Sequence, residues 1–539
     1  MKLEIQITEI APLSQEEKQR IIEQNEKRIL QYKNNKYEIN RLAFESLKDL
    51  IHSEQSYREL NGKKSFQKFF ASLKGKNKDV QDEIDKELAK EQYRAKYILE
   101  ELAERNLLSF DLLTAIHNKL ESSVVQVNSD YGQIYKVLVS FFKQVKSEIV
   151  QLENRVEILE RNVELLKWQN AIEYHMFRGK EYYELTDIEK IVCITRDFYE
   201  LTKGNWSTSD LLLLKTAMAT IGLQPKEKIN YEEFIRVVTK DQELYMKLIP
   251  QELLESKLET EWLIILSGIY KVKELEEDDN YVVANVLSLL DKHGVSVAQD
   301  EVKYGLLNEY EKSSAKVNLA TQIPNYEFVL ELLYNIQQAK QGQYMQLLAE
   351  KMKLARQLFL NYQMLEVKPM LEELTQYGFQ EARYLLIWLH EDGYQGIKRD
   401  QNLYEQLLLD GLEEGDVLTA IHYMMFQCQD MKRRSDIYNM YFEELVELAK
   451  TGDIFAVYEL GIVYMNPKKY HWVGEPDYAK AIQCFEYCDR QGYFRGSYSL
   501  AMRYEKGEGV KQDYARAFEC FSKASSRGFS LAKHKTDTI

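Results

Sequence analysis

The stretch GEGVKQDYARAFECFSKASSRG, residues 507–528, decides the fold, because its surroundings return at regular intervals along the last third of the chain. Glycines at positions 378, 415, 452, 492 and 528 are spaced 37, 37, 40 and 36 residues apart. A fixed period of about 20–50 residues is the sequence signature of a repeat architecture. The last third is therefore expected to be an array of similar units.

The residues between these glycines indicate two helices per unit. Asp400, Asp477 and Asp513 each lie 15 residues before one of the glycines, where an aspartate can cap the second helix of a hairpin. The closing glycine supplies the left-handed C-cap before the next unit. Since a single hairpin cannot bury its apolar face, neighbouring hairpins stack into a solenoid. Small and apolar residues repeat in the first helices: Ala382, Leu386, Ala456, Leu460, Tyr464, Leu500 and Tyr504.

This arrangement resembles Sel1-like repeats, which are helical-hairpin relatives of the tetratricopeptide repeat, over residues 366–539. The resemblance is weakest in the second unit, where LTAIHYMMFQCQDMKRRSD (418–436) lacks the Gly-x-Gly-Val turn. In the third unit the turn is replaced by NPKKYHWVGEPD (466–477). The resemblance implies an adaptor that holds signalling or assembly partners. No family is identified for residues 1–365.

The remainder of the chain also reads as helical. Only 7 prolines and 23 glycines occur in 539 residues, which suits long helices joined by short turns. Ser14 with Glu17 has capping-box spacing, and Ser207 to Asp210 offers N-caps before Leu211. The run from Trp168 reads as three helices with turns near Gly179 and Gly204. We expect an all-α protein, with a charged helical region at 1–130, a long coiled-coil-type helix at 131–170, a helical region at 171–365 and the solenoid at 366–539.

A heptad seam marks the long helix. Ten apolar residues alternate in steps of three and four, which is typical of a coiled-coil-type seam. In the first half of this helix the apolar stripe is too wide for a two-stranded coil, so we expect that half to pack inside an N-terminal helical bundle. Self-association through 135–166 stays open as the alternative. The seam residues are Tyr135, Leu138, Phe142, Val145, Ile149, Leu152, Val156, Leu159, Val163 and Leu166.

Charge disfavours nucleic acid as the main partner, because the formal net charge is −15. One basic patch stands apart: residues 61–78 hold six lysines and no acid, interleaved with phenylalanines. Such a patch could contact an anionic membrane or nucleic acid, but a solvated lysine face over buried phenylalanines is the preferred interpretation. The N-terminus lacks the plan of a signal peptide. The most apolar run, 262–270, is far below the roughly 20 residues that span a bilayer. A cytoplasmic location is expected.

No residue is predicted to be catalytic, to hold a cofactor or to bind a metal. Cys484 and Cys488 share one helix face, but no nearby Cys or His pair completes a site, so we expect both to be packed inward. Cys193 is expected to be a buried apolar residue, and His390 a helix-end cap or a solvated turn. The five cysteines, an odd and sparse set, fit a reducing compartment.

These observations favour a non-enzymatic adaptor or regulatory subunit that binds one or more proteins, among them a regulated enzyme, through the solenoid. Two other classes remain: an enzyme or toxin with an unrecognised site in 170–365, and a membrane- or nucleic-acid-associated helical protein that uses the 61–78 patch.

Overall fold

The computed structural model describes residues 13–50, 78–122, 131–156, 163–249, 263–276, 281–315, 317–392, 396–465 and 476–537. Over these ranges the chain is helical apart from two short two-stranded sheets, so the all-α prediction is confirmed. The chain divides into two compact units, one of residues 1–25 and 37–345 and one of residues 26–36 and 346–539. Helices α1 (Gln15–Tyr32) and α14 (Asn325–Leu360) each contribute to both units.

The first unit contains, besides parts of α1 and α14, a helix over residues 36–50 and two sheets. Its strands are β1 (Met176–Phe177), β2 (Lys180–Glu181), β3 (Lys228–Asn230) and β4 (Gln322–Pro324). Its helices are α3 (Lys78–Glu104), α4 (Phe110–Glu121), α5 (Tyr131–Val156), α6 (Val163–Ala171), α7 (Asp187–Thr202), α8 (Thr208–Thr220), α9 (Tyr231–Lys240), α10 (Gln242–Leu248), α11 (Ile264–Glu274), α12 (Tyr281–Lys292) and α13 (Gln299–Tyr310).

Local sequence signals account for several of these boundaries. Ser14 and Glu17 form the predicted capping box, in which each residue's backbone N–H donates to the other's side chain at 2.9 and 3.2 Å. Ser207 and Asp210 do the same at the start of α8. Gly204 turns the chain between α7 and α8, as predicted. Gly179, by contrast, lies in the tight turn of the β1–β2 hairpin, so the turn near Gly179 joins strands instead of helices.

Two helix–loop–helix pairs meet through the second sheet. Strand β3 lies between α8 and α9, β4 lies between α13 and α14, and the two strands pair antiparallel with Ile229 opposite Ile323. Phe234 on α9 packs edge-on against Phe328 on α14, with ring centroids 4.8 Å apart. This core connects segments about a hundred positions apart in the chain.

The first half of the heptad seam lies inside this unit. Leu138, Phe142 and Val145 on α5 are buried, and α5 packs against α4 and α8. The prediction of packing within a bundle is confirmed for these positions. The side chains beyond residue 150 up to 162 lie outside the described set, so self-association through the second half of the seam stays a prediction.

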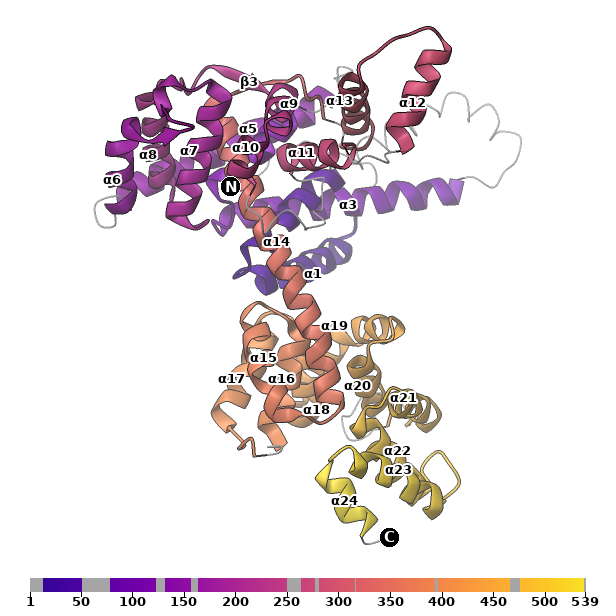
Figure 1. The fold of residues 1–539 in the computed structure, drawn as a ribbon. Coiled ribbons are helices and arrows are strands. Elements are labelled where there is room, and N and C mark those ends of the chain that lie inside the picture. Colours follow the sequence, from indigo (N-terminus) through magenta and orange to yellow (C-terminus); the bar gives the residue numbers. More distant parts are fainter. Residues whose placement is uncertain are drawn as a thin grey trace. The chain divides into compact units, whose positions relative to one another are not determined.

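The second unit is a stack of helical hairpins, which Figure 1 shows following one another in chain order from orange to yellow. Each closing glycine, at 378, 415, 452, 492 and 528, has a left-handed φ between 71° and 95°. Asp400, Asp477 and Asp513 accept the predicted capping hydrogen bonds from backbone N–H groups at the starts of α17, α21 and α23. The helices are α15 (Met364–Gln376), α16 (Gln380–Asp392), α17 (Gln401–Glu413), α18 (Val417–Phe426), α19 (Met431–Lys450), α20 (Ile454–Met465), α21 (Tyr478–Arg490), α22 (Phe494–Lys506), α23 (Tyr514–Ser526) and α24 (Ser530–Thr536).

Candidate protein-interaction surface

One face of the solenoid is covered by the chain's own helix α14. Phe359 near the end of α14 packs against Phe455 at the start of α20 and Phe494 at the start of α22, with ring centroids 6.1 and 5.9 Å apart. Tyr362 follows, edge-on to Phe494 at 5.2 Å and close to Gly528, the glycine that precedes α24. The end of α14 therefore contacts the beginnings of successive first helices of the hairpins.

Ionic contacts hold the same segment in place. The Arg356 guanidinium donates to Glu381 at the start of α16, with Nε 2.6 Å from Oε1, and its Nη2 lies 3.3 Å from Oδ2 of Asp453, which precedes α20. Burial raises the pKa of Glu381, and the neighbouring Arg356 opposes that change. A partner that bound to this face would have to displace α14.

Between the hairpins lies a fully buried polar cluster. Glu459 on α20 and His422 on α18 are both 0% exposed. Tyr384 on α16 donates a hydrogen bond to Oε1 of Glu459 at 2.6 Å, and His422 lies 3.3 Å from Glu391 and 3.6 Å from Glu459. Burial disfavours the charged imidazole, but these two carboxylates outweigh it and raise the pKa of His422. Because Tyr384, His422 and Glu459 are closed off from solvent, the cluster joins three hairpins and does not form a binding site.

An open pocket of about 500 Å³ lies on the solenoid between α15, the end of α16 and the start of α17. Its rim carries the exposed Leu365 and the half-buried Lys368 of α15, together with the exposed loop residues Lys398 and Arg399. Its most buried lining residue is His390, of which 3% is exposed, and neither ring nitrogen has a hydrogen-bond partner. The expectation that His390 caps a helix or lies in a solvated turn is wrong, because neighbouring helices enclose the ring.

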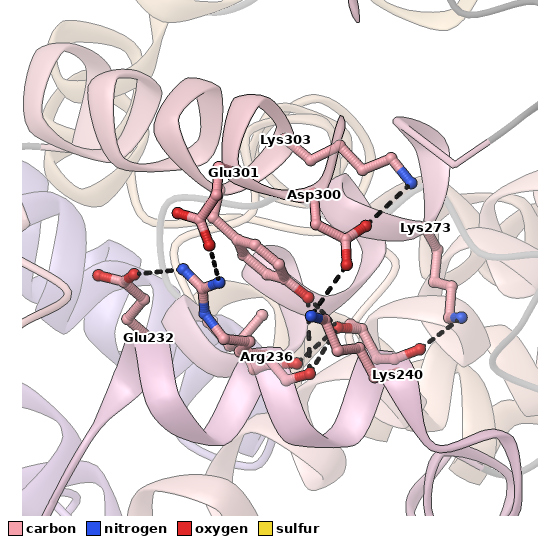
Figure 2. A network of polar contacts seen from close by, with 10 residues as sticks. Glu232, Arg236, Lys240, Lys273, Asp300, Glu301 and Lys303 are labelled. Carbon is pink, nitrogen blue, oxygen red and sulfur yellow. Dashed lines mark hydrogen bonds and ion pairs between the residues drawn. The ribbon is translucent and has the colours of Figure 1, made fainter. Parts of the chain in front are cut away.

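The first unit has a second groove, of about 780 Å³, lined by Arg178, Arg236, Lys240 and residues 241–243. Figure 2 shows the charges beside it: Arg236 lies between Glu232 and Glu301 at 3.0 and 2.9 Å, and Lys240 lies 2.9 Å from Asp300. Arg178 pairs with Asp241 and Glu243. These cations are already neutralised by carboxylates of α9, α10 and α13, so the network ties helices together and leaves little charge for a ligand.

A calcium-binding helix–loop–helix takes its ligands from loop positions 1, 3, 5, 7, 9 and 12. With Glu233 as the twelfth residue, positions 1, 3 and 5 of the loop between α8 and α9 are Gly222, Gln224 and Lys226. These residues offer no carboxylate, so the loop does not fit calcium. Across the described ranges, no group of three or more His, Cys, Asp or Glu side chains is placed to hold a metal ion.

The cysteines singled out in the sequence lie on helices and are buried or half-buried. Cys193 and Cys488 are fully buried, as predicted, and Cys484 is half-buried. Burial raises the pKa of the Cys193 thiol to about 12 and that of Cys484 to about 11, and it also raises the pKa of Cys488. Such thiols stay protonated and are poor nucleophiles. The lysine patch at 61–78 lies outside the described residues, apart from the backbone of Lys78.

Capped hairpins that close on left-handed glycines and stack in chain order define an α-helical repeat solenoid. A family model described as "Sel1 repeat" matches residues 454–487 and 495–529, which contain α20 to α23. The chain is thus a Sel1-like repeat protein in its C-terminal array.

Two examples represent the solved structures that are similar to the chain. A Sel1 repeat protein from Oxalobacter formigenes matches with 16% identity and a TM-score of 0.20, over 34% of this chain and 75% of that one. A protective antigen of uropathogenic Escherichia coli that displays an SLR fold matches with 14% identity and a TM-score of 0.25, over 83% of this chain and 82% of that one. Both TM-scores are below 0.5, so we infer nothing further from either structure. No curated protein matches the sequence.

None of the helices in the described ranges combines the length and the apolar composition that crossing a membrane requires.

Proposed function

We propose that this protein is a non-enzymatic adaptor or regulatory subunit that binds other proteins through its Sel1-like solenoid. The observation that carries the proposal is the stack of hairpins from α15 to α24, which presents an extended surface made of repeated elements. Repeat solenoids use such surfaces to bind partners. The buried cluster around Glu459 and the charge network around Arg236 are internally paired, which favours a structural role for both.

The face that carries α14 is already occupied by Phe359, Tyr362 and Arg356, so the proposed partner binds to the exposed edges of the hairpins. Passive scaffolding and regulation of a bound enzyme remain two forms of this one proposal. We also place the protein in the cytoplasm, because all five cysteines are unpaired and a reducing compartment keeps thiols in that state.

Affinity capture with the tagged full-length chain, followed by lysine cross-linking and mass spectrometry, tests the proposal. Exposed lysines on the solenoid, such as Lys432 and Lys511, provide sites for cross-links. We expect a specific partner whose cross-links map to residues 364–537. Cross-links confined to residues 78–345 would move the binding role to the first unit. Failure to capture any specific partner would contradict the adaptor function itself.

A further inference from the structure

We propose that the pocket between α15, α16 and α17 binds an acidic segment of a partner protein, with a carboxylate against Lys398 and Arg399 and an apolar side chain against Leu365. This inference rests on the proposed adaptor function and names the chemistry of the segment that the solenoid takes. Three features of the pocket support it: its uncompensated cations, its unpartnered histidine and its exposed leucine.

Two of the three cations at the rim, Lys398 and Arg399, lack acidic partners among the described residues. Within the described ranges Lys398 makes no ion pair, and Arg399 donates only to the neutral Oε1 of Gln401, at 3.0 Å. Lys368, the third cation, pairs with Glu372 on its own helix. Asp400, the one acid among the described lining residues, uses Oδ1 to cap α17 by accepting from the Leu403 backbone N–H at 3.1 Å. The pocket is thus a local positive site in a chain whose formal net charge is −15.

His390 gives the pocket a polar group in need of a partner. Its side chain lines the pocket and only 3% of the residue is exposed. Both ring nitrogens lack hydrogen bonds. A buried polar group without a partner costs free energy, which a ligand recovers if it supplies the missing bond. Burial and the nearby Lys368 lower the pKa of His390, so the ring is largely neutral at pH 7 and donates one N–H to an acceptor.

The apolar part of the lining indicates a peptide instead of a free anion. Leu365 is 61% exposed at the rim, and Ile397 is 8% exposed inside. An inorganic anion would leave Leu365 in water, whereas a segment with an acid next to a leucine-like residue covers both. The cations give orientation and the leucine gives contact area, which is the usual division of roles in a peptide site.

Fluorescence anisotropy with the full-length chain tests this site. The probe is a fluorescein-labelled hexapeptide of alternating Glu and Leu, measured at 150 mM salt beside the matched Gln-Leu and Lys-Leu peptides. The K398E/R399E double variant reverses two exposed charges, and K432E/K511E reverses two exposed solenoid lysines outside the pocket as the matched control. We expect the Glu-Leu peptide to bind the unmodified chain, and to bind K398E/R399E at least tenfold more weakly and the control within twofold.

Several outcomes would overturn the inference. The first is that the Glu-Leu peptide does not bind. The second is that the Gln-Leu peptide binds as tightly as the Glu-Leu peptide. The third is that K432E/K511E weakens binding as much as K398E/R399E does. Stronger competition by an unlabelled phosphoserine-Leu peptide would assign the pocket to a phosphorylated partner instead. The adaptor function is tested separately by affinity capture. If the K398E/R399E variant still captures the partner with cross-links in the solenoid, the proposed peptide site is contradicted and the adaptor function is retained.

Discussion

The Tyr384 hydroxyl on α16 donates to Glu459 on α20 at 2.6 Å, so a single hydrogen bond joins the first helices of two hairpins that are not neighbours. His422, on the intervening α18, lies 3.6 Å from the same carboxylate. All three side chains are 0% exposed. Polar groups this deep are costly unless they are paired, so the cluster specifies how three successive hairpins stack.

Replacement of Tyr384 by phenylalanine is therefore expected to destabilise the second unit. The Y384F change leaves the Glu459 carboxylate without its hydroxyl donor, at a cost of about 1–3 kcal/mol for a buried group. Urea unfolding followed by circular dichroism measures the shift in midpoint. Tyr514 is 57% exposed and serves as the control, since Y514F should change stability by less than about 0.5 kcal/mol. Equal midpoints for the two variants would show that the buried bond adds nothing.

The pH dependence of stability should report on His422. Its pKa in the fold is raised above the ordinary value of 6.5, so the folded state binds the proton more tightly than the unfolded state. The resulting stabilisation is fully present below pH 6.5 and is lost as the pH rises through the folded pKa. H422Q removes this titration. We expect the stability difference between the unmodified chain and H422Q to shrink from pH 6 to pH 8. A difference that is constant over this range would contradict the raised pKa.

Glu331 in the first unit should also make the folded state less stable as the pH rises, as His422 does, but over a lower pH range. Burial raises the pKa of Glu331 to about 7 from the ordinary 4.5, although Tyr231 and Asn118 donate to its Oε2 at 2.7 and 2.8 Å. The proton binds the folded state preferentially, so the free energy of unfolding of this unit falls by up to about 3 kcal/mol as the pH rises from 4.5 to above 7.

The E331Q variant tests this expectation, because the amide keeps an acceptor oxygen and cannot ionise. Thermal unfolding of the first unit should shift upward in E331Q at pH 8 and much less at pH 5. The exposed E309Q change provides the control, as 78% of the Glu309 side chain is accessible. Equal shifts at both pH values would show that the carboxyl is not titrating in this range.

The repeat features were predictable from sequence because they depend on local chemistry. An aspartate that caps a helix and a glycine with a positive φ act on residues within one turn, so Asp513 and Gly528 could be assigned from their spacing alone. The burial of Leu138 and Phe142 followed from their heptad period.

Contacts between distant segments left no such signal. The pairing of Ile229 with Ile323 depends on two short strands flanked by helices, and neither strand has an alternating pattern long enough to detect. The assignment of residues 26–36 to the second unit is equally invisible in the sequence. The expectation for His390 is wrong for a related reason, because its burial comes from helices that pack around it and not from its neighbours in the chain.

The contact of α14 with the hairpins predicts a local effect of a core substitution. Phe359 is 0% exposed between Phe455 and Phe494, so F359A should cost about 3–5 kcal/mol and release the end of α14. Hydrogen exchange should accelerate in residues 346–360 more than elsewhere in the unit. F518A, at a site 46% exposed, is the matched control. Unchanged protection of 346–360 in F359A would mean that other contacts hold the helix.

The glycine at position 509 separates two reasons why a turn needs glycine. Gly509 has a φ of +75°, and a β-carbon there would lie 2.4 Å from Cβ of Tyr478 on α21, the second helix of the preceding hairpin. Gly396, in the same unit, has a φ of +88° and nothing within 4 Å of a β-carbon. G396A should therefore cost only the left-handed backbone penalty, roughly 1 kcal/mol. G509A should cost about 1–3 kcal/mol more, because the turn must move away from α21. Urea midpoints of the two variants give the comparison. Equal losses of stability in G396A and G509A would show that Gly509 is needed only for its left-handed backbone. A larger loss in G509A would show that its close approach to α21 is required for stacking one hairpin on the next.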